Sequence, residues 1–355
     1  MPPLDPASAP PVRPATTADR PAWDEAARSL RGGSLLSTWG WGDLKAAQGW
    51  EVLRLMAGDG AAVRGTLWLQ LRHGPLGVAF AYAPRGPLVA DPGADGAVAT
   101  SLIAAARVEA RRRRALVLKI DPEWLEDDLG GAAVLRAVGA QPSWYDVQHR
   151  RTYLVDITGG EDAVLGRFKE STRRAIRRCG REGVDVSVTH DPVAAEQELQ
   201  PLMEETGRRS GFVPRVPRYY GDIVRLVGPS APAVTVVARH EGRVVAALLA
   251  LAVGPRLVYL YGGNRVSSGS VHPAYAAQWA AIRWGIEQGC SVYDMWGVPN
   301  HEDPSVPGYG YYEFKTRFNG HVVRHIRCQD VPLRPLGPLP RLAERVALRG
   351  RPLIT

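Results

Sequence analysis

Cysteine is scarce in this chain of 355 residues, which has three, Cys179, Cys290 and Cys328, and no CxxC pair. An odd number of widely spaced cysteines argues against both a disulfide framework and a structural zinc site. Long apolar runs are absent as well, and none approaches the roughly 18 residues that cross a bilayer. No secretory leader is recognisable at the N-terminus, so we expect a protein of the reducing cytoplasm.

The sequence also lacks the common nucleotide and hydrolase motifs. It contains no P-loop, no dinucleotide-binding fingerprint and no GxSxG elbow. His321 and His325 are four residues apart, but the valines beside them favour a strand, and there is no third ligand nearby in the sequence. We therefore expect no bound metal.

Arginine, in contrast, is abundant. Lysine and arginine together number 44 against 36 acidic residues, which gives a net charge of +8. A balance of this sign suits a polyanionic partner such as nucleic acid, a nucleotide, a diphosphate or an anionic lipid surface. Solubility alone is the alternative explanation.

Two stretches of the chain repeat one pattern. Each begins with three segments of alternating apolar and polar residues between Gly-containing turns, which predict three strands. An apolar helix and a short strand follow, with Asp121 near the end of the first such strand and Asp294 near the end of the second. The first stretch covers residues 50–87, 96–115 and 116–122, and the second covers residues 232–264, 274–290 and 291–297.

A meander, a helix and a strand in this order resemble an acyltransferase of the GNAT type, so the predicted fold class is α/β (α+β) with two tandem GNAT-like lobes. The expected parts are a disordered leader at 1–20, lobe 1 at 21–157, lobe 2 at 158–325 and a basic segment at 326–355 that packs back on lobe 1. The loop with which GNAT enzymes hold the pyrophosphate of CoA, R/Q-x-x-G-x-G/A, is incomplete. Its nearest match, residues 177–182, ends in Glu182. An acyl donor other than acyl-CoA is therefore expected.

One basic helix is predicted to link the lobes, over residues 162–183. Lys169, Arg173, Arg177 and Arg181 recur every four residues on one of its faces. Like charges at this spacing destabilise an isolated helix, and the phosphates of an RNA would relieve the repulsion. We therefore predict that this face binds tRNA, with an ordinary solvated helix as the alternative.

Aromatic residues flank cations in three other places. Lys315 lies within the stretch YYEFKTRF, Lys45 follows two tryptophans, and Arg215 precedes Tyr219 in a proline-stiffened loop. A cation in an apolar slot stabilises negative charge that develops on oxygen, and a cation beside an aromatic ring suits a phosphate and a sugar. For Lys315 the alternative is a side chain that snorkels past a packed phenylalanine.

These pieces, in this order, resemble the FemX/FemA/FemB family, whose members move an amino acid from aminoacyl-tRNA to an amine of a peptidoglycan precursor. The matching stretches are STWGWGDLKAAQGW, AYAPRGP, LKIDPEW, FKESTRRAIRRCGREGV, GFVPRVPRYY, YLYGGN, YDMWGV and YYEFKTRF. The resemblance implies the same two-lobed fold. Because the chain has no long heptad run, it also implies the compact form without a coiled-coil arm.

The resemblance assigns roles residue by residue. Phe314 and Lys315 fall on the pair associated with catalysis and with binding of the tRNA 3′ end. Binding of the precursor's phosphate and sugar falls on Lys45, Arg215, Tyr219 and Tyr261. No residue is a persuasive general base, so we expect the substrates to assist proton transfer, with Asp121 or Glu313 as the fallback base.

The predicted function is therefore aminoacyl transfer that forms the interpeptide bridge or branch of peptidoglycan. The acceptor would be UDP-MurNAc-pentapeptide or lipid II, and aminoacyl-tRNA would be a co-substrate, with no CoA or other cofactor. We expect a cytoplasmic enzyme whose basic C-terminal segment contacts the inner face of the membrane.

Three alternatives remain open. The same donor could serve an amine of an antibiotic or other secondary-metabolite intermediate. The chain could be a non-catalytic RNA-binding protein on a GNAT scaffold. A CoA-dependent N-acetyltransferase is the third, and the incomplete pyrophosphate loop argues against it.

Overall fold

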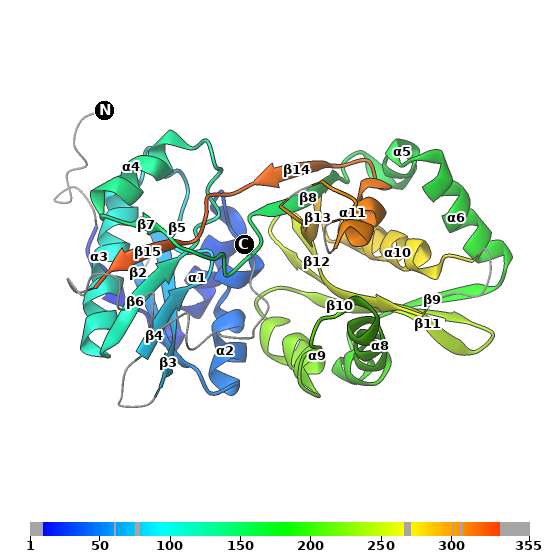
Figure 1. The fold of residues 1–355 in the computed structure, drawn as a ribbon, viewed down its shortest axis with the longest axis horizontal. Coiled ribbons are helices and arrows are strands. Elements are labelled where there is room, and N and C mark those ends of the chain that lie inside the picture. Colours follow the sequence, from blue (N-terminus) through cyan, green and yellow to red (C-terminus); the bar gives the residue numbers. More distant parts are fainter. Residues whose placement is uncertain are drawn as a thin grey trace. The chain divides into compact units, whose positions relative to one another are not determined.

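The computed structural model describes residues 10–59, 62–74, 79–265, 271–300, 302–305 and 308–333. The chain divides into two compact units. The first consists of Met1–Arg150 with Arg324–Thr355, and the second of Arg151–Val323. Each unit contains one mixed sheet with helices on both faces (Figure 1).

The sheet of the first unit has the strand order β1-β2-β3-β4-β6-β15-β7, and β5 pairs with β3. Only the pairing of β4 with β6 is parallel among these strands. The strands are β1 (Val12–Pro14), β2 (Glu51–Asp59), β3 (Ala62–His73), β4 (Ala79–Ala83), β5 (Leu88–Val89), β6 (Ala115–Ile120), β7 (Gln141–Pro142) and β15 (Gln329–Pro332).

Both faces of this first sheet are buried. Leu67, Leu69 and Leu71 of β3 join the core under two helices, α3 (Gly96–Arg112) and α4 (Leu129–Ala137). Trp68 points to the opposite face, where its Nε1 donates a hydrogen bond to the carbonyl oxygen of Leu36 at 2.8 Å. That face carries α1 (Arg20–Ser29) and α2 (Trp39–Ala47), together with the short turns Thr17–Asp19 and Leu35–Ser37 (Figure 1). A strand segment covered on both faces is apolar on both sides, as the buried Leu67–Leu69 segment of β3 is.

The sheet of the second unit has the order β14-β8-β13-β12-β11-β10-β9. The pairing of β12 with β13 is parallel. The strands are β8 (Arg151–Asp156), β9 (Val184–Thr189), β10 (Ala233–His240), β11 (Arg243–Val253), β12 (Arg256–Asn264), β13 (Val292–Gly297) and β14 (His321–Arg324).

Helices cover both faces of this sheet too (Figure 1). One face packs on α5 (Gly160–Arg167), α6 (Glu170–Arg181), α10 (Pro273–Glu287) and α11 (Tyr309–Thr316). The other carries α7 (Pro192–Ala194), the turn Ala195–Leu199, α8 (Gln200–Ser210), α9 (Tyr219–Asp222) and the turn Ile223–Val227. Among the described helices, none is long and apolar enough to cross a membrane.

The predicted repeat and fold class are confirmed. The run β2, β3, β4, α3 and β6 of the first unit recurs as β10, β11, β12, α10 and β13 in the second. In both copies the strand after the helix pairs in parallel with the last strand of the meander. The longest helix of the described residues is α3, with 17 residues, so no coiled-coil arm interrupts them.

The predicted disordered leader is wrong for residues 10–20. Val12–Pro14 forms β1, which pairs with β2, and Arg13 forms an ion pair with Asp19 at 2.6 Å. Strand pairing uses backbone groups, so a segment poor in apolar residues can still join the edge of a sheet.

The single linking helix predicted over 162–183 is also wrong, because α5 ends at Arg167 and α6 begins at Glu170. Between them Phe168 has an extended backbone. Its buried ring lies 5.8 Å from Trp279 and 5.2 Å from Phe318, between ring centres. The break therefore accompanies the burial of this ring, which aromatic packing in the core stabilises.

The boundary predicted at residue 157 differs from the observed one, because the second unit begins at Arg151, whereas the boundary predicted at 325 lies within two residues of the return to the first unit at Arg324. β8, expected in lobe 1, pairs with β13 in the sheet of the second unit. β15 belongs to the sheet of the first unit, where it pairs with β6 and β7. Residues 334–355 of the basic C-terminal segment lie outside the described residues.

Candidate active site

Lys315 lies on α11 with its amino group inside the second unit. Only 6% of the residue's surface is exposed. Its Nζ donates a hydrogen bond to the carbonyl oxygen of Gly297 at 2.6 Å and lies 5.1 Å from the ring centre of Tyr311. A carbonyl dipole and an aromatic face thus replace much of the water that surrounds an ordinary lysine.

Burial lowers the pKa of Lys315 from 10.5 to about 7, and the negative charge of Asp294 opposes this shift. Asp294 is buried in turn. Its carboxylate accepts hydrogen bonds from the Thr152 hydroxyl and, at 2.8 Å, from the Trp296 backbone N–H, and it pairs with Arg256 at 3.4 Å. The amine of Lys315 can therefore gain or lose its proton near neutral pH.

The carbonyl that holds Lys315 lies where two parallel strands stop pairing. β12 and β13 pair from Arg256 to Val258, opposite Val292 to Asp294, and both strands continue beyond these residues. Gly297 is the last residue of β13. The carboxyl ends of parallel strands are where α/β sheets commonly bind ligands.

Phe314 belongs to a ring cluster beside Lys315. Its ring centre lies 5.1 Å from that of Tyr275 on α10 and 5.5 Å from that of Phe318. Such contacts orient α11 on α10. Phe314 is half-buried, so part of its surface is still open to a ligand.

Three of the residues predicted to bind phosphate and sugar meet in the second unit. Nε of Arg215 donates to the hydroxyl of Tyr261 at 3.2 Å, and its guanidinium lies 5.4 Å from the ring centre of Tyr219. Burial raises the pKa of Tyr219 well above 10, so this phenol stays protonated. A guanidinium with neighbouring phenol hydroxyls suits a phosphate and a sugar.

Lys45, the fourth of these residues, belongs to the first unit and lies in the last turn of α2. Its Nζ donates to Gln48 Oε1 at 3.3 Å and lies 5.4 Å from the ring centre of Trp41. The side chain is half-buried, with a cation–π contact at its end.

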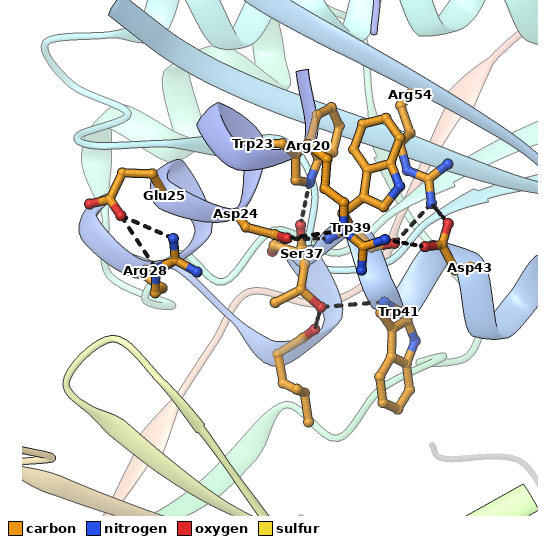
Figure 2. Close-up of polar contacts among 12 residues, drawn as sticks. Arg20, Trp23, Asp24, Glu25, Arg28, Ser37, Trp39, Trp41, Asp43 and Arg54 are labelled. Carbon is orange, nitrogen blue, oxygen red and sulfur yellow. Dashed lines mark hydrogen bonds and ion pairs between the residues drawn. The ribbon is translucent and has the colours of Figure 1, made fainter. Parts of the chain in front are cut away.

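Buried polar contacts position α2, as Figure 2 shows. Asp24 of α1 accepts a hydrogen bond from the backbone N–H of Trp39 at 2.8 Å. Arg54 of β2 donates to Asp43 at 2.6 Å, and its guanidinium lies 4.0 Å from the ring centre of Trp39. The helix that carries Lys45 is thereby tied to both α1 and the sheet.

Asp121, the possible base, follows β6 in the first unit and is buried. Its two carboxylate oxygens accept hydrogen bonds from the Tyr82 hydroxyl at 2.7 Å and from the Arg85 backbone N–H at 2.8 Å. Burial raises the pKa of Asp121 to about 6. The carboxylate holds the turn at Arg85, whose φ is 49°.

The four cations predicted to bind tRNA differ in their surroundings, and only three of them are exposed. Arg173 donates to the carbonyl oxygens of Gly166 at 3.0 Å and Phe168 at 2.5 Å, so it closes the end of α5. Lys169, at the N-cap of α6, is exposed, as are Arg177 and Arg181.

Two family models match the chain. The FemAB family matches residues 25–237, and a GNAT acetyltransferase domain matches residues 166–316. The chain belongs to the FemAB family. The predicted family is confirmed.

Relatives of known activity cover nearly the whole FemAB chain. It is 23% identical to the lipid II:glycine glycyltransferase of Staphylococcus saprophyticus, over 88% of this chain and 91% of the relative. The chain is also 23% identical to the UDP-N-acetylmuramoylpentapeptide-lysine N(6)-alanyltransferase of Weissella viridescens, over 91% of this chain and 93% of the relative. Both relatives are aminoacyltransferases, which confirms the predicted class of enzyme.

Solved structures share the fold. The crystal structure of FemX superposes with a TM-score of 0.82 at 20% identity, over 94% of this chain and all of that one. A tandem GNAT protein from the clavulanic acid biosynthesis pathway superposes with a TM-score of 0.52 at 14% identity, over 92% of this chain and 99% of that one. These likenesses support the two-lobed fold.

Two neighbours of Lys315 in this FemAB chain, Asp294 and Gly297, were not predicted as part of the site. An aspartate within an apolar strand was the one available indication, because a buried carboxylate requires a cation or hydrogen-bond donors. Within the described residues, no cluster of three or more His, Cys, Asp and Glu side chains is arranged for a metal ion.

Proposed function

We propose that this FemAB protein transfers an amino acid from aminoacyl-tRNA to an amine of a peptidoglycan precursor. The observation that carries the proposal is the buried amino group of Lys315, held by Gly297 at the end of β13. The relatives supply the chemistry, since their names describe transfer of glycine to lipid II and of alanine to the lysine of UDP-N-acetylmuramoyl-pentapeptide.

Lys315 would act as the cation of the reaction. The amine nitrogen attacks the ester carbonyl carbon, and negative charge develops on the carbonyl oxygen. The bond to the ribose oxygen then breaks, the nitrogen loses a proton and the ribose oxygen gains one, which leaves an amide and free tRNA. A buried ammonium stabilises both oxygens. A pKa near 7 also makes Lys315 a better proton donor to the ribose oxygen than an ordinary lysine.

Arg215, Tyr219 and Tyr261 of the second unit would bind the phosphates and sugar of the acceptor. The contacts that support this assignment are the Arg215–Tyr261 hydrogen bond and the cation–π contact of Arg215 with Tyr219. Asp121 is not assigned as the base, since both of its oxygens hold protein groups.

The donor would lie against Phe314 and the basic surface of α6. Lys169, Arg177 and Arg181 are exposed there and suit the phosphates of a tRNA. We propose that the reaction needs no metal or coenzyme, because the ester of the donor already carries an activated acyl group.

The test is a transfer assay with a mixture of charged tRNAs and either UDP-MurNAc-pentapeptide or lipid II, with products identified by mass. We expect the mass of one amino acid to be added to the acceptor. Lys315→Met should lower the rate at least about a hundredfold. Arg317→Met, at the C-cap of the same helix and in an ion pair with Glu313, is the matched control and should stay close to the parent. No product with either acceptor would contradict the proposal and favour a different amine acceptor.

A further inference from the structure

The loop between α8 and α9 exposes apolar side chains to solvent. Val213 is 84% exposed, Val216 67% and Phe212 38%. The other exposed large apolar side chains of the described residues are Val108, Leu125, Leu129, Val188, Val193 and Tyr311. No other stretch of five described residues holds three, and a concentrated exposed apolar patch commonly marks an interaction surface.

The main chain of this loop is nevertheless well anchored. The backbone N–H of Phe212 donates to the carbonyl oxygen of Gly207 at 3.2 Å. Gln200 Nε2 donates to the carbonyl oxygen of Arg215, also at 3.2 Å. A Cβ at Gly207 would lie 2.8 Å from Pro214 Cγ, so the loop packs closely on α8. The fold therefore holds the backbone and leaves the valine side chains outside.

Positive charge surrounds these apolar side chains. Arg208, Arg209, Arg215 and Arg218 are exposed, and the sequence from Gly207 to Tyr220 contains no acidic residue. Aliphatic side chains with arginines around them suit the boundary between the phosphates and the acyl chains of a bilayer. Single-stranded RNA, in contrast, is bound mainly by stacking on flat rings, and the two most exposed side chains here are valines.

We propose that residues 208–218 dock on an anionic bilayer, with Val213 and Val216 entering the interfacial region and Arg208, Arg209 and Arg218 facing lipid phosphates. The inference rests on the proposed function and specifies its acceptor as a lipid-linked one. Arg215, on the same loop, reaches Tyr261. The diphosphate of a lipid-linked precursor lies at the bilayer surface. Docking of this loop would bring Arg215 and Tyr261 to the same depth, so that they could bind it.

The first test is sedimentation of the full chain with vesicles of phosphatidylglycerol and phosphatidylcholine, and with phosphatidylcholine alone. We expect binding to the anionic vesicles and an affinity about tenfold lower for V213S/V216S. The control, V108S/L129S, also removes two exposed aliphatic side chains and should bind like the parent. A parent that does not bind, or a V213S/V216S variant that binds equally well, overturns the proposal. So does a variant that loses affinity for tRNA while keeping its affinity for vesicles.

The second test compares the two acceptors. V213S/V216S should transfer more slowly to lipid II in anionic vesicles and at the parent's rate to UDP-MurNAc-pentapeptide. Equal rates for variant and parent with both acceptors would contradict the docking while leaving the proposed function intact. If the parent serves neither acceptor, the proposed function fails, and the vesicle experiment alone decides the docking.

Discussion

Lys315 combines a cation with an environment that disfavours its charge. The hydrogen bond to Gly297 and the charge of Asp294 favour the ammonium form, whereas burial favours the neutral amine. Because the predicted reaction needs the ammonium form, these opposing effects set the pH range of the enzyme.

The first prediction concerns pH. The rate should fall as pH rises through about 7, where Lys315 loses its proton. Asp294→Asn removes the charge that supports the ammonium form, so the alkaline limb of the pH–rate profile should move to lower pH. Thr152→Val removes one donor to Asp294 but keeps its charge, and should leave the limb in place. An unchanged limb in Asp294→Asn would show that another group controls the profile.

The second prediction concerns stability. The folded state binds the Lys315 proton more weakly than the unfolded state, so between pH 7 and 10.5 the unfolded state holds more protons. The contribution of Lys315 to the free energy of unfolding should therefore increase as pH rises through this range, which makes the protein more stable. Lys315→Met should abolish this contribution, which urea titrations of both proteins at several pH values would measure. Identical pH dependence in the two proteins would contradict the shifted pKa.

At the scale of single elements, α2 and α6 each carry a predicted binding group, and buried contacts hold each helix in place. α2 depends on Asp24 and Arg54, as Figure 2 shows. α6 is anchored by Thr172, whose hydroxyl donates to the carbonyl oxygen of Arg317 at 2.9 Å, and by its buried Cys179.

The third prediction concerns α2. Asp24→Ala leaves the buried N–H of Trp39 without its acceptor, which should cost about 1–3 kcal/mol of unfolding free energy. Glu25→Ala, the neighbouring position, breaks only an exposed ion pair with Arg28 and should cost less than about 1 kcal/mol. Urea unfolding would measure both, and equal losses would contradict the role given to Asp24.

The fourth prediction concerns α6. Arg177→Gln with Arg181→Gln should weaken tRNA binding, and the slope of log affinity against log salt should fall by about 0.7–0.9 for each phosphate that is no longer neutralised. Arg174→Gln with Arg178→Gln is the control on the same helix, since these arginines pair with Glu170 and Glu182. Equally weakened binding in the two variants would contradict the prediction, because it would show that tRNA binding depends on the net charge of α6 and not on the face that carries Arg177 and Arg181.

At the scale of the whole molecule, each unit is completed by a strand that lies outside its own repeat. β15, near residue 330, pairs with β6 of the first unit, and β8 pairs with β13 of the second. The first unit therefore cannot form its complete sheet until the chain has passed through the second unit and returned.

The fifth prediction follows from this topology. Val331→Asp places an unpaired charge at a fully buried position of β15 and should destabilise the first unit by more than about 3 kcal/mol. Hydrogen exchange should then lose protection in β3 and β6 and keep it in β10 and β11. Val331→Ala, which keeps the strand apolar, should have a smaller effect. Protection that falls equally in both units would mean that they unfold together.

Local pattern determined much of this fold. Alternating apolar residues and Gly-containing turns predicted β2, β3, β4, β10, β11 and β12, because strand formation and burial of one face follow from neighbouring residues. The aromatic stretch around Lys315 likewise predicted a shielded cation, and the structure buries this lysine on α11. The paired edge segment at Val12–Pro14 was missed, since backbone pairing leaves little trace in side-chain composition.

The tertiary structure alone decided which distant groups meet. Gly297 lies 18 residues before Lys315 and contributes only a carbonyl oxygen, which no side-chain pattern reveals. The sheets that β8 and β15 join depend on pairing with β13 and β6, which are far from them in the sequence. The sequence by itself thus determined the repeated elements and the family, because these depend on local periodicity and motif. Long-range packing decided the protonation of Lys315 and the membership of each sheet, because burial and strand pairing are properties of the folded chain.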